Sequence, residues 1–293
     1  MDEMNFPCPH DTDPQIFREA LAYSERTTGF TATLIEKDYH CSLILRWFFD
    51  DDTSLIFKGG TCLSKVYTDF YRLSEDLDFI IPVPVDASRN HRRSEMDPVK
   101  RIFDGLQKAV PGVAISEVFR GHNESRQYVG YIEYRSAIIE TQESIKLEIG
   151  LREPLIKSSV SNEARTIVMN PFTRRGLLAT FPVRAMAERE AYAEKARAAL
   201  TRKEPAIRDF FDLFYAVHKM GLKLHDREFL EMVRRKLKVP GNDPVDVSKE
   251  RKKKLDRQLD GQLKPVLRPR DFDWFNFDEA FEIVCGVAEA VSA

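Results

Sequence analysis

The amino-acid sequence is richest in chemically specialised residues in two short stretches, KGGTCLSK at residues 58–65 and RLSEDLDF at residues 72–79. The first stretch follows the apolar run 55–57, which reads as a short buried strand. It leads through two glycines into a helix predicted for residues 62–71. The second stretch enters another strand, predicted for residues 77–81 and closed by prolines. Together they predict a strand, a turn, a helix and a second strand in close succession.

The Gly59-Gly60 turn is a candidate phosphate-binding loop. Glycine lets the backbone approach a ligand closely, and the exposed N–H groups at the start of a helix suit phosphate. Thr61 adds a hydroxyl group, and Lys65 adds a cation one turn into the helix. The spacing matches neither the P-loop motif nor the GxGxxG motif of dinucleotide-binding proteins. On its own, the glycine pair is also typical of an ordinary tight turn.

Asp76 and Asp78 form the second half of the pattern. They are two residues apart in a strand-like run, so both carboxylates point to one face. Two carboxylates on one face repel each other unless a cation joins them, and oxygen ligands at this spacing suit Mg²⁺. A solvated acidic turn is the alternative, but the apolar neighbours Leu77, Phe79 and Ile80 favour a functional site.

A centre of this kind usually takes a third carboxylate from a neighbouring strand. Glu148 is the natural candidate, because it lies between apolar residues in the predicted strand segment IKLEIG, residues 145–150. Glu140 and Glu143 lie nearby and remain alternatives. An exposed glutamate on an amphipathic strand would give the same pattern.

The rest of the chain predicts helices at both ends and strands in the middle third. Three further helices are predicted in the first part of the chain. One begins at Asp13-Pro14, a second covers residues 31–49, and a third begins at Asp97-Pro98. Further strands are predicted at residues 113–119, 128–134 and 144–151. From about Pro182 onward the pattern becomes helical, with helices at residues 184–200, 207–220, 226–237, 248–259 and 277–290.

This order predicts an α+β fold with a mixed sheet rather than a doubly wound Rossmann fold. We expect three parts. Residues 1–54 form a helical segment packed on the core, residues 55–180 form the core with the mixed sheet, and residues 181–293 form a C-terminal helical domain.

The predicted elements follow a definite order: a strand, Gly-Gly-Thr, a helix, Asp-x-Asp and a later acid. This order resembles that of the DNA-polymerase-β-type nucleotidyltransferase superfamily. Within it, the two opening stretches resemble the AbiEii/AbiGii toxin family, the nucleotidyltransferase component of bacterial abortive-infection and toxin–antitoxin systems. Two later strings are also similar to motifs of that family: AEKARAALTR at residues 193–202 and RDFFDLF at residues 208–214. The fold implied is a nucleotidyltransferase-type mixed sheet followed by a helical domain.

The resemblance implies transfer of a nucleotide from a nucleoside triphosphate, with release of pyrophosphate. Asp76 and Asp78 would hold Mg²⁺, with Glu148 as the third acid that polarises the acceptor hydroxyl. Lys195 and Asp209 would also be catalytic. The residues expected to bind the nucleotide are Lys58, Gly59, Gly60, Thr61, Lys65, Arg72, Ser74, Arg202 and Arg208.

The later strings also make physical sense. Lys195 and Arg202 are seven residues apart, so they share one helix face and could grip a triphosphate. A solvated helix face is the alternative for Lys195. Asp209 and Asp212 share a face as well, and each could pair with Lys195 or a neighbouring arginine. The aromatic residues within 210–215 are expected in the core rather than on a base-stacking surface.

Net charge gives no argument for nucleic acid binding, because 45 Lys+Arg against 47 Asp+Glu leave a formal charge of -2. Basic residues do cluster locally at residues 89–93 and 249–254, with additions at 234–236 and 268–270. These clusters fit an RNA acceptor, which the resemblance suggests is the 3′ end of tRNA, but solvated helix faces would look the same. A protein or small-molecule acceptor, or a non-catalytic nucleotide-binding module, remains open. The resemblance also implies a cognate antitoxin.

Other classes of protein are excluded by composition. With 43% hydrophobic and 31% charged residues, the chain can form a substantial core, which excludes disordered and low-complexity classes. Its four cysteines are scattered and predict neither a disulfide framework nor a zinc site. No signal peptide and no apolar run long enough for a membrane helix is visible. We therefore expect a soluble, cytoplasmic protein.

Overall fold

The computed structural model describes residues 8–50 and 53–293, which separate into two compact units. Unit 1 comprises the described residues up to Leu155 together with Ser159–Met186. Unit 2 comprises Ile156–Ser158 and Ala187–Ala293. The three-part division expected from the sequence stays a prediction.

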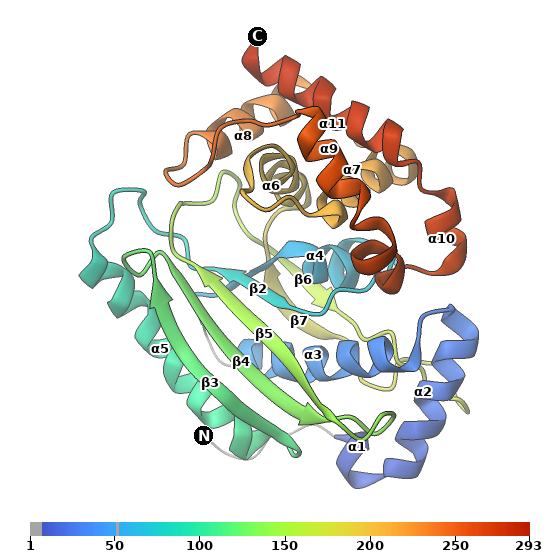
Figure 1. Cartoon of the computed structure of the whole chain (residues 1–293). Coiled ribbons are helices and arrows are strands. Elements are labelled where there is room, and N and C mark those ends of the chain that lie inside the picture. Colours follow the sequence, from blue (N-terminus) through green and yellow to red (C-terminus); the bar gives the residue numbers. More distant parts are fainter. Residues whose placement is uncertain (1–7, 51–52) are drawn as a thin grey trace. The chain divides into compact units, whose positions relative to one another are not determined.

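Unit 1 is built on a seven-stranded sheet in the order β3-β4-β5-β2-β1-β7-β6 (Figure 1). The pairs β2–β5 and β1–β7 are parallel and the other pairs are antiparallel, so the predicted α+β fold with a mixed sheet is confirmed. The strands are β1 (Ile56–Lys58), β2 (Leu77–Ile80), β3 (Val113–His122), β4 (Gln127–Arg135), β5 (Gln142–Gly150), β6 (Val160–Ala164) and β7 (Phe181–Ala185).

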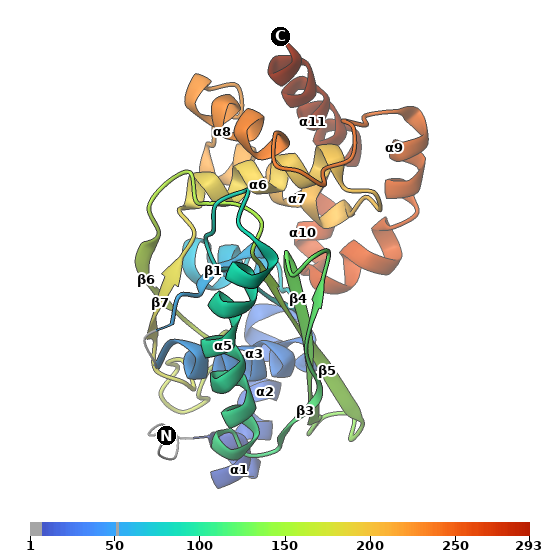
Figure 2. The same ribbon diagram turned by 90° about the vertical axis from the view of Figure 1, so that its left-hand side faces the viewer.

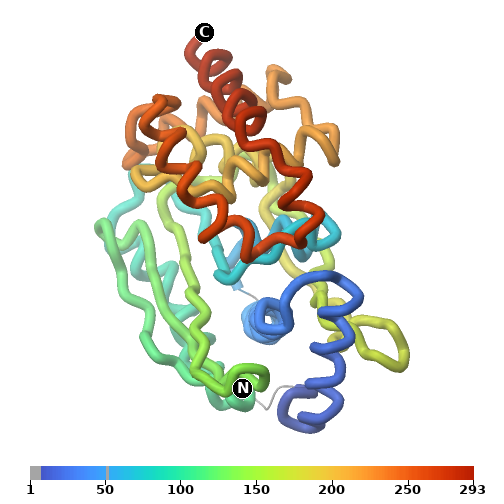
Figure 3. The backbone as a smooth tube through the Cα atoms, turned by 45° about the vertical axis from the view of Figure 1, so that its right-hand side comes forward, coloured from blue at the N-terminus to red at the C-terminus, as the bar shows by residue number. Residues whose placement is uncertain are grey.

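The helices of unit 1 cover the apolar face of this sheet. They are α1 (Pro9–Thr12), α2 (Pro14–Thr28), α3 (Ala32–Asp50), α4 (Gly59–Cys62), the π-helical turn η1 (Leu63–Tyr67) and α5 (Arg89–Ala109). Phe48 of α3 lies 5.6 Å from Phe79 of β2 and 6.4 Å from Phe103 of α5, measured between ring centroids. Figure 2 shows α5 running beside the strands, and Figure 3 shows α3 nearly end-on with β3–β5 on one side and α2 on the other. Helix α3 is therefore the centre of the core.

The sheet has one apolar and one polar face because side chains alternate along each strand. In β4, residues 128, 130, 132 and 134 are all buried, as the sequence pattern predicts. In β2 and β5, Leu77, Phe79, Leu147 and Ile149 are buried on the same side. The residues between them therefore point to the opposite face, where the site lies.

Strands β6 and β7 were not predicted, and the helix expected from residue 184 begins only at Glu188. The signal for β7 is the short alternation of buried Phe181, Val183 and Ala185. Pro182 obscures it, because proline is disfavoured inside sheets. It is tolerated because β7 pairs with β1 only near Ala185, so the backbone at Pro182 needs no donor on that side.

Two predicted helix starts are also wrong. Helix α5 begins at Arg89, because the Ser88 hydroxyl accepts a hydrogen bond from the His91 N–H at 3.1 Å, and the helix then continues through Pro98. The helix expected from Cys62 begins at Gly59 and ends at Tyr67. Strand β1 therefore passes into helix with no intervening loop.

Lys65 is a fully buried cation in the core of unit 1. Its ammonium donates to Oδ1 of Asp38 at 2.6 Å and to the Ser42 hydroxyl at 2.7 Å. The other carboxylate oxygen of Asp38 accepts the Ile167 N–H at 3.1 Å. This ion pair joins η1, α3 and the segment after β6, so its role is structural.

We expect Lys65→Met to lower the free energy of unfolding of unit 1 by about 3–5 kcal/mol, because it leaves Asp38 buried without its cation. The measurement is urea denaturation of a Trp274→Phe background, in which Trp47 of unit 1 is the fluorescent reporter. Lys100→Met removes a partly exposed lysine and should change the value by less than about 1 kcal/mol. Equal stability of Lys65→Met and the wild type would contradict the structural role.

Unit 2 is helical, and α6 packs against α7 and α8 while α11 packs against α7. Its helices are α6 (Glu188–Thr201), α7 (Ile207–Met220), α8 (Arg227–Leu237), α9 (Lys249–Asp256), the short turns η2 (Leu259–Leu263) and η3 (Lys264–Val266), α10 (Pro269–Trp274) and α11 (Phe277–Ser292). Phe210 stacks on Phe281 at 5.8 Å, and Phe211 and Phe214 are buried, so these aromatic residues are core as expected. No helix among the described residues is long and apolar enough to span a membrane.

The crossover Ile156–Ser158 is fixed to unit 2 by the buried Glu190 of α6. The carboxylate accepts the Ile156 N–H at 3.0 Å and the Lys157 N–H at 2.8 Å. The same carboxylate pairs with the buried Lys236 at 2.8 Å. A segment between two strands of unit 1 therefore belongs to the packing of unit 2.

Candidate active site

The polar face of unit 1 carries a row of charged side chains across three neighbouring strands. Strand pairing places Asp78 of β2 directly opposite Lys58 of β1 on one side and Glu148 of β5 on the other. Asp76 lies two residues before Asp78, just ahead of the strand, and both are half-buried. Paired residues on adjacent strands point to the same face, so this row brings the predicted carboxylates Asp78 and Glu148 together.

The alternatives to Glu148 lie elsewhere. Glu143 is on the same strand opposite Tyr134, and its carboxylate is 3.6 Å from the ammonium of Lys37. Glu140 lies in the turn before β5, with a φ of 57°. Of the three glutamates, only Glu148 is in register with Asp78.

Gly59 is required where β1 turns into α4. Its φ of +79° disfavours residues with a side chain, and a Cβ there would lie 2.3 Å from Oδ2 of Asp78. The carboxylate of Asp78 therefore packs directly against the backbone of the glycine turn. The two halves of the sequence motif, separated by about twenty residues, form one structural unit.

Gly60 and Thr61 hold the segment before β2. A Cβ on Gly60 would lie 2.3 Å from the guanidinium of Arg72, which is itself buried and donates to the Leu73 carbonyl at 3.1 Å. The hydroxyl of the buried Thr61 donates to the Asp76 carbonyl. These contacts position the Asp76 backbone from within the protein.

Three of the residues expected to bind the nucleotide are buried, and their nucleotide contacts stay predictions. The Thr61 hydroxyl, the Arg72 guanidinium and the Lys65 ammonium are all buried and bonded inside unit 1. A polar residue beside a glycine turn gives the same sequence pattern whether it binds a nucleotide or stabilises the fold. Ser74 is half-buried before β2, and its expected nucleotide contact stays a prediction, as do those of Lys58, Gly59 and Gly60.

Lys146 is a residue of the site that sequence reasoning missed. It precedes Glu148 by two residues on β5, so both side chains lie on one face, and its ammonium is 2.6 Å from Oε2 of Glu148. The signal was present in the alternation of IKLEIG, where Lys146 and Glu148 occupy equivalent positions. The structure shows the two as an ion pair.

The charges of this face shift the pKa of both partners. Burial alone would raise the pKa of Glu148, but the hydrogen bond and charge of Lys146, with Lys58, lower it below its usual value. Burial opposes the charge of Lys146, yet Glu148 first and then Asp76 and Asp78 raise its pKa above the usual value. Glu148 is therefore a carboxylate and Lys146 an ammonium at neutral pH.

The donor atoms suit a hard divalent cation, although they do not form a complete set of ligands. Asp76 and Asp78 are half-buried and offer carboxylate oxygens, and the Asp78 carboxylate packs against the backbone of Gly59. Across the described ranges 8–50 and 53–293, no group of three or more His, Cys, Asp or Glu residues is arranged to hold a metal ion. Glu148 faces Lys146 instead.

A second charged cluster lies within unit 2. The ammonium of Lys195 is 2.9 Å from Oδ1 of Asp209 and 2.8 Å from Oδ2 of Asp212, and both carboxylates are buried. Arg202 is half exposed, with a side-chain exposure of 51%, and lies 3.4 Å from the other oxygen of Asp209. The four residues that the sequence placed on shared helix faces are therefore brought together. Arg208 of α7 is half-buried.

Opposing factors set the pKa of Asp209. Burial would raise it, but the charges of Lys195 and Arg202 outweigh burial and the repulsion from Asp212. The pKa of Asp209 is therefore lower than usual. A cation fixed between two buried carboxylates is the defining feature of this cluster.

The basic clusters are only partly exposed. Arg92 is buried and donates to the Val85 and Glu124 carbonyls, and Arg251 is buried and donates to the Ala199 and Arg202 carbonyls. Lys236 pairs with Glu190, and Arg234 donates to carbonyls at the end of α11. The exposed members are Arg89, His91, Arg93, Arg235, Lys249, Lys253, Lys254 and Arg270. Four cations of the predicted RNA-binding clusters are therefore structural: Arg92, Arg234, Lys236 and Arg251.

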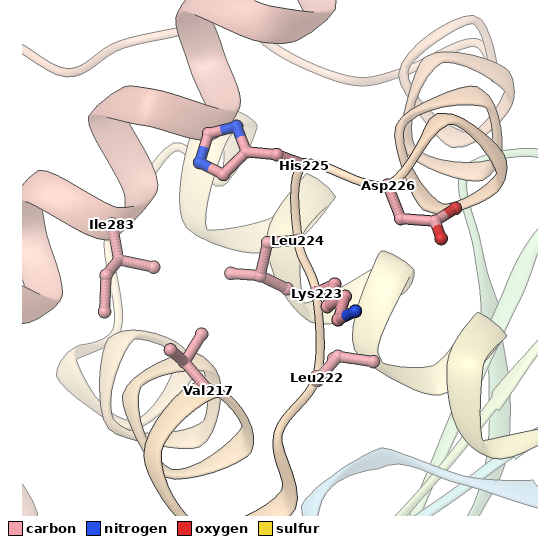
Figure 4. Close-up of a pocket in the computed structure, with 7 residues that line it drawn as sticks. All are labelled: Val217, Leu222, Lys223, Leu224, His225, Asp226 and Ile283. Carbon is pink, nitrogen blue, oxygen red and sulfur yellow. The ribbon is translucent and has the colours of Figure 1, made fainter.

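A pocket of about 570 Å³ in unit 2 contains none of these residues. It lies beside the loop after α7 and is lined by Val217, Leu222, Lys223, Leu224, His225, Asp226 and Ile283 (Figure 4). Figure 4 shows the apolar side chains of Val217, Leu224 and Ile283 converging, while Asp226 points away from them. This lining lacks the convergent charges that a triphosphate needs.

Comparison with known protein families decides the classification. The model of the nucleotidyl transferase AbiEii toxin, from type IV toxin–antitoxin systems, matches residues 43–282. The chain belongs to this family. It is therefore a nucleotidyltransferase, and the matched range includes the charged row of unit 1 and the Lys195 cluster of unit 2.

A solved structure shows the same fold at low identity. The crystal structure of JHP933 from Helicobacter pylori matches with a TM-score of 0.50 and 16% identity, over 89% of this chain and 93% of that chain. A second H. pylori protein, described as a candidate nucleotidyltransferase, has a TM-score of 0.49 and 16% identity, over 88% of this chain and 94% of that chain. No curated protein matches the sequence.

We expect Gly59→Ala to reduce nucleotidyl transfer about 100-fold, because the added Cβ displaces the Asp78 carboxylate by the order of an ångström. The measurement is pyrophosphate release. Gly221→Ala is the matched control, since Gly221 has a similar φ of +68° but no atom within 4 Å of the added Cβ. Both variants carry the same kind of backbone strain, so an equal loss of activity in both would contradict a specific effect on Asp78.

We expect Lys195→Met to destabilise unit 2 by about 3–5 kcal/mol at neutral pH, because two buried carboxylates lose their cation. In the wild type the lowered pKa of Asp209 gives stability that is complete above the ordinary value of about 3.9 and is lost as pH falls through the lower folded-state value. The deficit should therefore shrink toward acid pH.

Urea denaturation at a series of pH values measures this deficit. In a Trp47→Phe background, Trp274 of α10 reports on unit 2. Lys203→Met removes an exposed lysine of the same unit and should leave stability unchanged at every pH. A Lys195→Met deficit that stays constant from about pH 5 down to about pH 2 would contradict the charge-based explanation, because the wild-type contribution of Asp209 is lost only below its ordinary pKa.

Proposed function

We propose that the chain transfers a nucleotide from a nucleoside triphosphate to the 3′ end of tRNA in a Mg²⁺-dependent reaction. The observation that carries the proposal is the direct strand pairing of Asp78 with Glu148, beside Asp76 and the Gly59 turn. Carboxylates gathered on one face, with Asp78 packed against the backbone of Gly59, match the needs of a bound metal and a triphosphate. Membership of a nucleotidyltransferase family supports the same chemistry.

Asp76 and Asp78 would hold Mg²⁺, which would supply positive charge against the triphosphate. The chain's own contribution is positioning. Thr61 fixes the backbone of Asp76, and the buried Phe79 anchors the strand that carries Asp78. Lys58, paired with Asp78 across the strands, is the cation we assign to the triphosphate. Most of the rate would then come from fixed charges and fixed geometry.

In unit 2, we propose that Lys195 is the functional cation of the two later family motifs, residues 193–202 and 208–214. Asp209 and Asp212 both bind its ammonium, so the Lys195 side chain has little freedom to move. Arg202 is more exposed and is the second candidate for contact with a phosphate. These roles rest on the sequence motifs and on the contacts that Lys195 and Arg202 make with the two aspartates within unit 2.

Local positive charge supports a polyanionic acceptor. Exposed cations on α5, including Arg89 and Arg93, and on α9, including Lys253 and Lys254, give local positive surfaces on a chain with almost no net charge. Such surfaces suit a polyanionic acceptor more than a neutral small molecule. The toxin family to which the chain belongs implies a cognate antitoxin as the biological partner.

We expect total tRNA to be labelled when the protein is incubated with Mg²⁺ and at least one of the four nucleoside triphosphates carrying an α-phosphate label. Asp78→Ala should abolish labelling, because it removes a central carboxylate of the site. Asp86→Ala is the matched control, since Asp86 is an exposed aspartate of unit 1 outside the site. Labelled products are separated by size on a denaturing gel.

Each other outcome points to a different function. Labelled protein bands or small products without labelled RNA would refute the tRNA acceptor and keep the enzyme class. Triphosphate binding that is unaffected by loss of Asp76 and Asp78, without pyrophosphate release, would show a non-catalytic module. Absence of label with all four nucleotides would refute transfer to tRNA.

A further inference from the structure

The polar face of unit 1 carries a cation beside the carboxylates of the proposed metal site. Asp76, Asp78 and Glu148 lie on one face, and Lys146 lies on the same face of β5 with its ammonium 2.6 Å from Glu148. The charges of Asp76 and Asp78 also act on Lys146. One ammonium therefore interacts with all three carboxylates that the metal site would use.

The exposure of this ion pair differs from that of a structural one. Lys146 and Glu148 have side-chain exposures of 34% and 29%, whereas Lys65 and Asp38 have 0% and 2%. The ammonium of Lys65 also donates to a backbone carbonyl and a hydroxyl of α3, which fixes it in the core. A pair that borders on solvent can separate at low cost, because water replaces the lost contact.

We propose that Lys146 is a built-in counter-ion that occupies Glu148 in the metal-free protein and competes with a divalent cation for it. This inference rests on the proposed metal role of Asp76, Asp78 and Glu148. Without a metal, the ammonium offsets the repulsion between the carboxylates. A divalent cation near Glu148 is repelled by the positive charge of Lys146, so the cation and the ammonium cannot both bind the carboxylate closely. Lys146 thus sets how much metal is needed to complete the site.

The test is the affinity for Mn²⁺ alone, measured by calorimetry on the full chain without nucleotide. Lys146→Met should bind Mn²⁺ about tenfold more tightly than the wild type, because a like charge beside the Glu148 carboxylate is removed. Lys146→Arg keeps the charge and should bind with affinity close to that of the wild type. Lys100→Met is the matched control, since Lys100 has a similar exposure of 35% and lies on α5, which covers the opposite face.

A second readout covers the metal-free state. In the presence of a chelator, Lys146→Met should unfold at a lower urea concentration than Lys100→Met, and added Mn²⁺ should restore more stability to it than to the wild type. Unchanged or weaker Mn²⁺ binding by a folded Lys146→Met variant would overturn the inference, because Lys146 would then be neutral or helpful to the metal. Wild-type binding that is unaffected by Asp78→Ala would instead refute the metal assignment, and the inference with it.

Discussion

The alternation of side chains along the short central strand β2 is the constraint on which the site depends. Leu77 and Phe79 anchor the strand in the apolar core, so Asp78 must point to the opposite face. Pairing with β1 and β5 then adds Lys58 and Glu148 to the same row. A shift of one residue in register would bury the carboxylate and expose the phenylalanine, so the packing of the core also fixes the chemistry.

Local patterns in the sequence predicted much of this arrangement. The strand alternation identified Asp78 and Glu148, and apolar periodicity gave helix α7 with its observed ends, residues 207–220. The sequence could not show which strands pair, because pairing depends on contacts between distant segments. For the same reason β7 was missed: its alternation is short and interrupted by Pro182, and it forms only through its partners β1 and β6.

The roles of individual cations were the hardest to predict. Lys65, Lys146 and Lys195 are indistinguishable in charge, yet the first is a fully buried core ion, the second borders on solvent and the third is fixed between two carboxylates. Two arginines of the predicted basic clusters, Arg92 and Arg251, are buried and donate to backbone carbonyls. Exposure is a property of the tertiary fold, so clustering of charge along the chain alone overestimates a binding surface.

The crossover held by Glu190 has a consequence for how the chain reaches its folded state. Because residues 156–158 pack with unit 2 while residues on both sides belong to unit 1, the chain passes between the units three times rather than once. Unit 2 is thus discontinuous in sequence, and its packing includes contacts across a long separation along the chain, from Ile156 to Glu190 and from Lys157 to Glu228. During synthesis this short segment must wait for α6 and α8 to emerge from the ribosome, so the two units complete their folding as interdependent rather than successive bodies.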